Sequence, residues 1–141
     1  MVTNLCNALY GKWHKVYFDN FFTSHRLIED LFLNKILSCG RIRAGRKHFP
    51  PEIFYKNVTK NESWRYGNGA VSVYAEMDKK FVFIAETVTN TQSETLGTVQ
   101  RKRKDGEQED IPCPDIAREY NKFMGGVDRN DQQKSYYSIN L

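Results

Sequence analysis

Apolar residues at helical spacing follow two short hydroxyl side chains early in the chain. Thr23 or Ser24 suits the N-cap of a helix, because a side-chain oxygen there accepts a hydrogen bond from a backbone amide of the first turn. The apolar positions that follow recur at the spacing of one helix face: Leu27, Ile28, Leu31, Phe32 and Ile36. The pattern predicts a helix with one buried side. Residues 3–10 predict a shorter helical end, which stops at Gly11.

Strands are predicted where apolar residues alternate or run together. Residues 16–19 form a short apolar run, and residues 37–44 alternate weakly, with Ile42 as the clearest inward position. Residues 71–75 and 81–85 face each other across a polar connection, which predicts a β-hairpin. Residues 87–98 are polar, and the charged stretch 106–114 predicts a loop.

A second helix is predicted near the C-terminal end. Pro114 suits its first turn, because proline lacks the amide that would have no partner there. Its buried face is marked by Ile116, Tyr120 and Phe123 or Met124. Gly125 and Gly126 predict a bend in the backbone before Asp128.

Length, charge and cysteine content narrow the class of protein. A chain of 141 residues has room for one domain, and its net charge of +4 permits nucleic-acid binding without requiring it. Cys6, Cys39 and Cys113 are odd in number and lack the spacing of a zinc site, so we interpret them as reduced thiols of an intracellular protein. No apolar run is long enough to cross a membrane, and no signal peptide precedes the chain, which predicts a soluble protein.

Three aspartates are candidates for binding a divalent metal ion. Asp19 ends the first apolar strand, and Asp128 and Asp131 lie three residues apart, on one face of the predicted C-terminal helix. Carboxylates that converge from a strand end and a helix are typical of metal-dependent phosphoryl transfer. The alternatives are structural: Asp19 closes a turn, and Asp128 and Asp131 are acidic residues favoured near a helix N-terminus.

Basic side chains gather in two segments, which are candidates for DNA binding. The first holds Arg41, Arg43, Arg46 and Lys47, and the second holds Arg101, Lys102, Arg103 and Lys104. Guanidinium and ammonium groups bind phosphates, and a short basic run also serves as a nuclear-import signal. For both segments the alternative is a solvated charged surface. Trp64 and Tyr66 suit either base stacking or core packing.

Four segments in order resemble the catalytic domain of piggyBac-type transposases. Residues 17–24 (YFDNFFTS) resemble the second acidic segment of that family, and residues 120–132 (YNKFMGGVDRNDQ) resemble the third. Residues 40–47 and 101–106 resemble the segments between them. The resemblance implies an α/β fold, a partial RNase H-like (DDE/D transposase) fold with an inserted small β-containing domain. It implies catalytic parts at residues 1–45 and 115–141, the latter truncated, and the insertion domain at residues 46–114.

The resemblance also implies a function, which is cut-and-paste DNA transposition in the nucleus. Asp19 and Asp128 match the second and third catalytic aspartates, and Asp131 matches a further acidic position at the metal site. The implied cofactor is Mg²⁺ or Mn²⁺. The implied partners are DNA and, in the intact family, a second copy of the protein, with no membrane and no small-molecule substrate. The first aspartate of the family has no match here, so we expect the chain to be inactive alone.

Three interpretations of the present role remain open at this stage. The chain is a piece of an enzyme whose missing strand and aspartate come from elsewhere, a domesticated DNA-binding module without catalysis, or a decayed remnant. A binding module would show salt-dependent DNA affinity without cleavage. A remnant would lack a cooperative melting transition.

Overall fold

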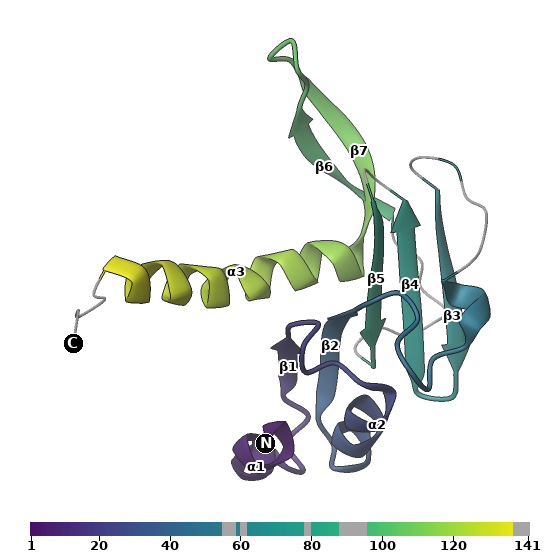
Figure 1. Ribbon diagram of the computed structural model, residues 1–141, viewed down its shortest axis with the longest axis vertical. Coiled ribbons are helices and arrows are strands. Elements are labelled where there is room, and N and C mark those ends of the chain that lie inside the picture. The colour runs from purple at the N-terminus through teal and green to yellow at the C-terminus, as the bar shows by residue number, and fades with distance from the viewer. Residues whose placement is uncertain (55–58, 60–61, 78–79, 88–95, 137–141) are drawn as a thin grey trace.

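The computed structural model describes residues 1–54, 59, 62–77, 80–87 and 96–136 (Figure 1). A mixed α/β architecture is built on a five-stranded sheet with the strand order β1-β2-β5-β4-β3. A separate two-stranded sheet, β6-β7, projects from its upper end, and a long helix, α3, runs out to one side (Figure 1). Within the described residues, no helix is both long and apolar enough to cross a membrane.

The five-stranded sheet contains strands from residues 15–42 and from residues 63–86. β1 (Lys15–Phe18) pairs in parallel with β2 (Leu37–Ile42). β2 then pairs antiparallel with β5 (Phe81–Glu86), followed by β4 (Val71–Met77) and β3 (Ser63–Asn68). The predicted strands and the β4–β5 hairpin are therefore confirmed. One sheet thus contains strands from both sides of residue 45. The domain boundaries placed at residues 45 and 114 stay predictions.

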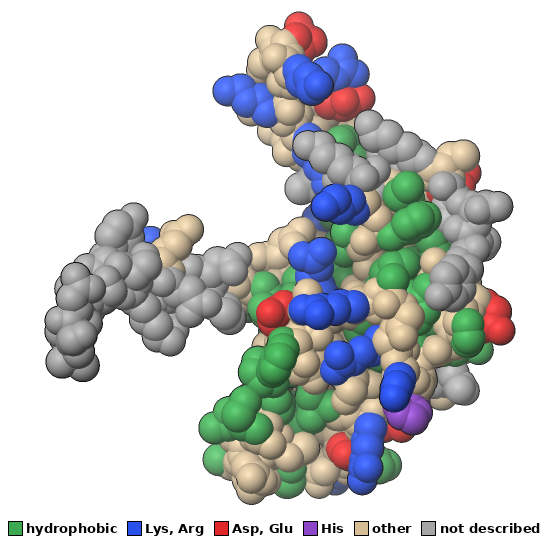
Figure 2. Space-filling model, viewed as in Figure 1, with side chains coloured by type: hydrophobic (Ala, Val, Ile, Leu, Met, Phe, Trp, Pro, Cys, Tyr) green, Lys and Arg blue, Asp and Glu red, His purple; other side chains and the backbone are tan. Residues whose placement is uncertain are grey.

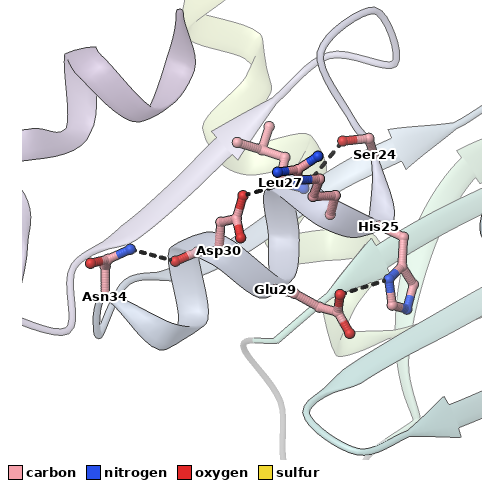
Figure 3. A network of polar contacts seen from close by, with 7 residues as sticks. Ser24, His25, Leu27, Glu29, Asp30 and Asn34 are labelled. Carbon is pink, nitrogen blue, oxygen red and sulfur yellow. Dashed lines mark hydrogen bonds and ion pairs between the residues drawn. The ribbon is translucent and has the colours of Figure 1, made fainter.

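The first predicted helix forms the crossover between β1 and β2. α2 (His25–Leu33) begins after Ser24, whose Oγ accepts a hydrogen bond of 3.2 Å from the Leu27 amide (Figure 3). Ile28 and Leu31 are completely buried, which confirms the predicted inner face. Ile36 lies beyond the helix and is also fully buried.

Short helices complete the N-terminal half. α1 (Val2–Cys6) and a 3₁₀ turn, η1 (Asn7–Leu9), end before Gly11, whose φ of 77° suits glycine. A second 3₁₀ turn, η2 (Pro51–Ile53), follows the loop after β2.

The loop predicted for residues 106–114 is wrong. Residues Gln108–Pro114 form β7, which pairs antiparallel with β6 (Leu96–Lys102). Charged side chains on these strands point into solvent, so the apolar alternation that announces a half-buried strand is missing. Of the polar stretch 87–98, residues 96–98 belong to β6, and residues 88–95 lie outside the described residues.

The bend predicted at Gly125–Gly126 is also wrong, because α3 runs without a break from Asp115 to Tyr136. Glycine permits a bend without imposing one, and each helical glycine costs only about 1 kcal/mol relative to alanine. Ile116 and Tyr120 are buried and Met124 is half-buried, as predicted, whereas Phe123 is 48% exposed.

Two hydrophobic clusters fill opposite faces of the large sheet. One packs α2 against the sheet and contains Ile28, Leu31 and Phe83. The other packs α3 against the sheet and contains Cys39, Ile84, Ile116 and Tyr120. α3 thereby lies across the face that includes Tyr17 of β1.

Candidate functional site

Asp19 stands directly after β1, with an exposed side chain. Its backbone carbonyl accepts hydrogen bonds from the amides of Phe22 and Thr23, at 3.1 and 3.3 Å, and from Thr23 Oγ1 at 2.8 Å. One carboxylate oxygen accepts a hydrogen bond of 2.5 Å from the Asn20 amide. Asp19 therefore closes a turn, as the structural alternative expected. The turn is built largely on its carbonyl, and the carboxylate is still presented to solvent.

Asp19 and Arg41 occupy corresponding positions on neighbouring parallel strands. Phe18 of β1 is opposite Gly40 of β2, so Asp19 and Arg41 follow at the same edge of the sheet. Gly40 allows the turn after β1 to lie close to β2. A Cβ atom at this position would collide with Thr23 Oγ1 and with the ring of Phe18.

Tyr120 brings α3 to this edge of the sheet. Burial raises its pKa to about 12, with opposing contributions from the nearby charges of Arg41, which lowers it, and Asp19, which raises it. A hydrogen bond with the backbone of Arg41 also lowers the pKa. An acidic and a basic side chain thus lie within electrostatic reach of the same phenol.

A polar anchor and an aromatic stack hold α3 against β1. Glu119 Oε1 accepts hydrogen bonds of 2.7 Å from Lys15 Nζ and 2.7 Å from the Tyr17 hydroxyl. The rings of Tyr17 and Phe123 stack with their centroids 4.7 Å apart. Burial raises the pKa of the Tyr17 hydroxyl, and the Glu119 carboxylate raises it further. These contacts hold α3 against β1 as far along the helix as Phe123.

Asp128 and Asp131 lie in that second half of α3. They follow Phe123 by five and eight residues, roughly 7.5 and 12 Å along a helix axis. Their side chains lie outside the described part of the structure, so their pairing with Asp19 stays a prediction. In the part of the chain that is described, no group of three or more His, Cys, Asp or Glu side chains gathers around one point.

Asp19 suits one ligand position for a hard divalent cation. Its carboxylate is exposed at the end of a strand, and Mg²⁺ and Mn²⁺ prefer oxygen ligands that leave room for water. The turn that carries Asp19 is held by three hydrogen bonds to its own carbonyl. This donor fits the implied metal, and Asp128 and Asp131 of α3 are the further ligands expected within this chain.

The first basic segment begins at the same sheet edge. Arg41, Arg43 and Lys47 are exposed and Arg46 is half-buried, in a loop held by the Arg46 amide donating to the Arg43 carbonyl at 3.2 Å. No acidic residue occurs between Arg41 and Pro51. Figure 2 shows Lys and Arg side chains in a band that runs from the tip of the β6–β7 hairpin down over this face of the sheet.

The second basic segment is electrostatically different. Its four exposed basic residues lie on β6 and the following turn, and four acidic residues follow within positions 105–110. Arg103 forms a two-pronged contact with Glu109, at 2.9 and 2.8 Å. Because its charges are matched locally, this segment attracts phosphate less than the first. The DNA and nuclear-import roles of Arg101, Lys102, Arg103 and Lys104 stay predictions.

Trp64 and Tyr66 have different surroundings, and a base-stacking role for either stays a prediction. The ring of Trp64 packs edge-on against Phe81 and Phe83, with centroids 5.9 and 6.4 Å apart, so it belongs to the packing of the sheet. Tyr66, on the same strand, is 40% exposed and borders a cavity.

Two contributors to the site were missed from the sequence. Gly40 immediately precedes the first basic segment, and only its close approach to Thr23 and Phe18 reveals its role. The role of Glu119 could not be predicted from the neighbouring sequence, because its partners Lys15 and Tyr17 lie 104 and 102 residues away.

Two comparisons with known proteins agree with this arrangement. A family model described as Transposase IS4 matches residues 1–141. The cryo-EM structure of a piggyBac transposase synaptic complex with hairpin DNA superimposes with a TM-score of 0.71, at 21% sequence identity. That match covers 95% of this chain and 26% of the transposase chain, so this chain spans about a quarter of its length. The likeness confirms the RNase H-like fold class.

Proposed function

Because the chain belongs to the Transposase IS4 family, we propose that it carries DNA-binding and metal-binding parts of a piggyBac-like transposase catalytic domain. The observation that carries the proposal is the edge where β1 and β2 end. Asp19 follows the last paired residue of β1 there, Arg41 holds the corresponding position on β2, and both lie close enough to Tyr120 of α3 to influence its pKa. The edge therefore combines a ligand for a cation with groups that bind phosphate.

The acidic and basic residues of this edge have different proposed roles. Asp19, with Asp128 and Asp131 from α3, would hold Mg²⁺ or Mn²⁺. When bound, such ions polarise a phosphodiester and lower the pKa of a coordinated water. Arg41, Arg43, Arg46 and Lys47 would hold the DNA backbone, since guanidinium groups bind phosphate oxygens in pairs. Positioning the scissile phosphate beside Asp19 is the role of this basic segment.

The double substitution Arg43→Gln and Arg46→Gln tests the DNA contact. Each lost phosphate contact should reduce the slope of log affinity against log salt by about 0.9, so we expect the slope to fall by about two and the affinity to fall at every salt concentration. The measurement is fluorescence anisotropy with a labelled 20-base-pair duplex in a salt series. The matched control is Lys12→Gln with Lys35→Gln, because both are exposed basic residues that precede β1 and β2, at the opposite end of these strands. Unchanged affinity in the double variant would refute the contact.

The same preparation tests the catalytic part of the proposal. Only two of the three catalytic aspartates of the family have matches in this chain, so we expect it to bind DNA without cutting it in Mg²⁺ or Mn²⁺. The products of an end-labelled duplex on a denaturing gel show the outcome. Metal-dependent cleavage that is lost in Asp19→Asn would show instead that these residues suffice for a working site.

A further inference from the structure

A cavity of about 360 Å³ lies between the start of α2, the loop after β2 and the outer strands of the sheet. Its walls carry His25, His48, Phe49 and Tyr66, and its remaining lining includes Val71 and Val73 of β4. Volumes of about 300–1,000 Å³, with mostly apolar walls and a few polar groups, are typical of small-molecule sites. The proposed catalytic function does not use this cavity.

The aromatic walls of the cavity are held in place. His25 Nδ1 lies 3.2 Å from Glu29 Oε2, one helical turn away, and Figure 3 shows this contact fixing the imidazole at the start of α2. The edge of the same ring meets Phe49, with centroids 5.4 Å apart. Tyr66 stands opposite Val73 in the β3–β4 pairing. The cavity is thus bounded by flat side chains whose positions are set by the fold.

The basic loop leads directly into this cavity. Arg46 and Lys47 immediately precede His48 and Phe49, and the Phe49 amide donates to the Arg46 carbonyl at 3.4 Å. His48 is exposed and has a φ of 70°, which is uncommon for a residue other than glycine and holds its imidazole at the cavity rim. A strand whose phosphates lie on this loop would have its bases within reach of the cavity.

We propose that the cavity accepts one unpaired nucleobase of a DNA strand whose phosphates are held by Arg43, Arg46 and Lys47. This inference rests on the DNA binding proposed above. A base offers two flat apolar faces to the tyrosine and phenylalanine rings, and its polar edge offers hydrogen-bond partners to the two imidazoles. A base paired within a duplex has its faces covered by stacking, so the site selects unpaired positions.

The test compares three DNAs of equal length and charge. One is a full duplex, one carries a single unpaired adenine, and one carries an abasic nucleotide in place of that adenine. Affinities are measured by anisotropy at one salt concentration. The variants are Tyr66→Ala, Tyr66→Phe and, as a matched control, Trp13→Ala. Trp13 is also exposed, but it contacts Phe32 at the opposite end of α2 from His25.

We expect the wild-type chain and Trp13→Ala to bind the unpaired-adenine DNA about tenfold more tightly than the other two DNAs. Tyr66→Ala should lose this preference and leave duplex affinity unchanged, and Tyr66→Phe should keep it. Equal affinity of the wild type for all three DNAs, or an equal loss in Tyr66→Ala for all three, would overturn the base site and leave the proposed DNA binding intact. Binding to none of them would overturn both proposals.

Discussion

At the scale of single residues, Gly40 controls how closely the turn after β1 can lie against β2. The turn holds Asp19 through hydrogen bonds to its carbonyl, and Thr23 of that turn occupies the space that a Cβ at position 40 would need. Any side chain at this position must displace Thr23 or Phe18, and with them the backbone that presents the acidic group.

We expect Gly40→Ala to destabilise the chain by about 1–3 kcal/mol, the usual cost of forcing extra volume into a packed interior. Thermal melting followed by circular dichroism measures the effect. Gly126→Ala is the matched control, since this helical glycine has open space around it and alanine favours a helix by about 1 kcal/mol. A Gly40→Ala chain as stable as the wild type would show that the turn moves freely.

The position of Asp19 was predictable from sequence, whereas the requirement for Gly40 was not. Asp19 ends a visible apolar run, so its place at a strand end follows from the local pattern. Gly40 is constrained by Phe18 and Thr23, and those contacts exist only after β1 and β2 pair.

At the scale of elements, the docking of α3 on β1 depends on a carboxylate between two donors. Burial raises the pKa of Glu119, but the hydrogen bonds from Lys15 and Tyr17 and the charges of Lys15 and Lys122 outweigh it and hold the pKa below its usual value of 4.5. A lowered carboxyl pKa stabilises the folded state above pH 4.5. That contribution is lost as the pH falls through the lower folded value.

Glu119→Gln is therefore expected to lower stability at pH 7 by about 0.5–1 kcal/mol, a modest value because Lys15 is half exposed. The difference from wild type should shrink as the pH falls below 4.5. Melting temperatures from pH 7 to pH 3 give the comparison, with Glu52→Gln as a control at an exposed position on η2. A difference that stays constant over this range would contradict the charged anchor.

Elements with a buried face were predicted well, and the exposed hairpin was not. α2 and the β4–β5 hairpin bury apolar residues at regular spacing, and this spacing is visible in the chain. The described positions of β6 and β7 are almost entirely exposed up to residue 110, so their pairing left no hydrophobic pattern to detect.

At the scale of the whole molecule, three free cysteines lie buried in the two hydrophobic clusters. Cys6 is on the α2 side of the sheet, and Cys39 and Cys113 are on the α3 side. Burial raises the pKa of all three thiols, so little reactive thiolate is present near neutral pH.

We expect all three cysteines to react slowly with a thiol-directed reagent at pH 8 and to react completely in denaturant. Mass spectrometry of timed samples identifies which thiol is labelled. Similar slow rates for the three would show that both clusters open together, as in a cooperative domain. Fast labelling of Cys113 alone would show instead that the α3 side opens independently.

The family resemblance predicts the overall topology, whereas local sequence patterns predict only the separate strands and helices. Periodicity predicted strands, but the pairing of β2 with β5 joins residues more than 40 positions apart and has no local signature. The same holds for the contact between the two ends of the chain, where Lys15 meets Glu119.

That contact also sets an order of events during synthesis. Glu119 is added 104 residues after Lys15, which takes roughly 5–20 s at about 5–20 residues per second. Throughout that interval, β1 and the turn at Asp19 exist on the ribosome without the helix that holds the other candidate ligands. A nascent chain therefore cannot assemble the proposed metal site until translation has passed Asp131, the last of its candidate ligands.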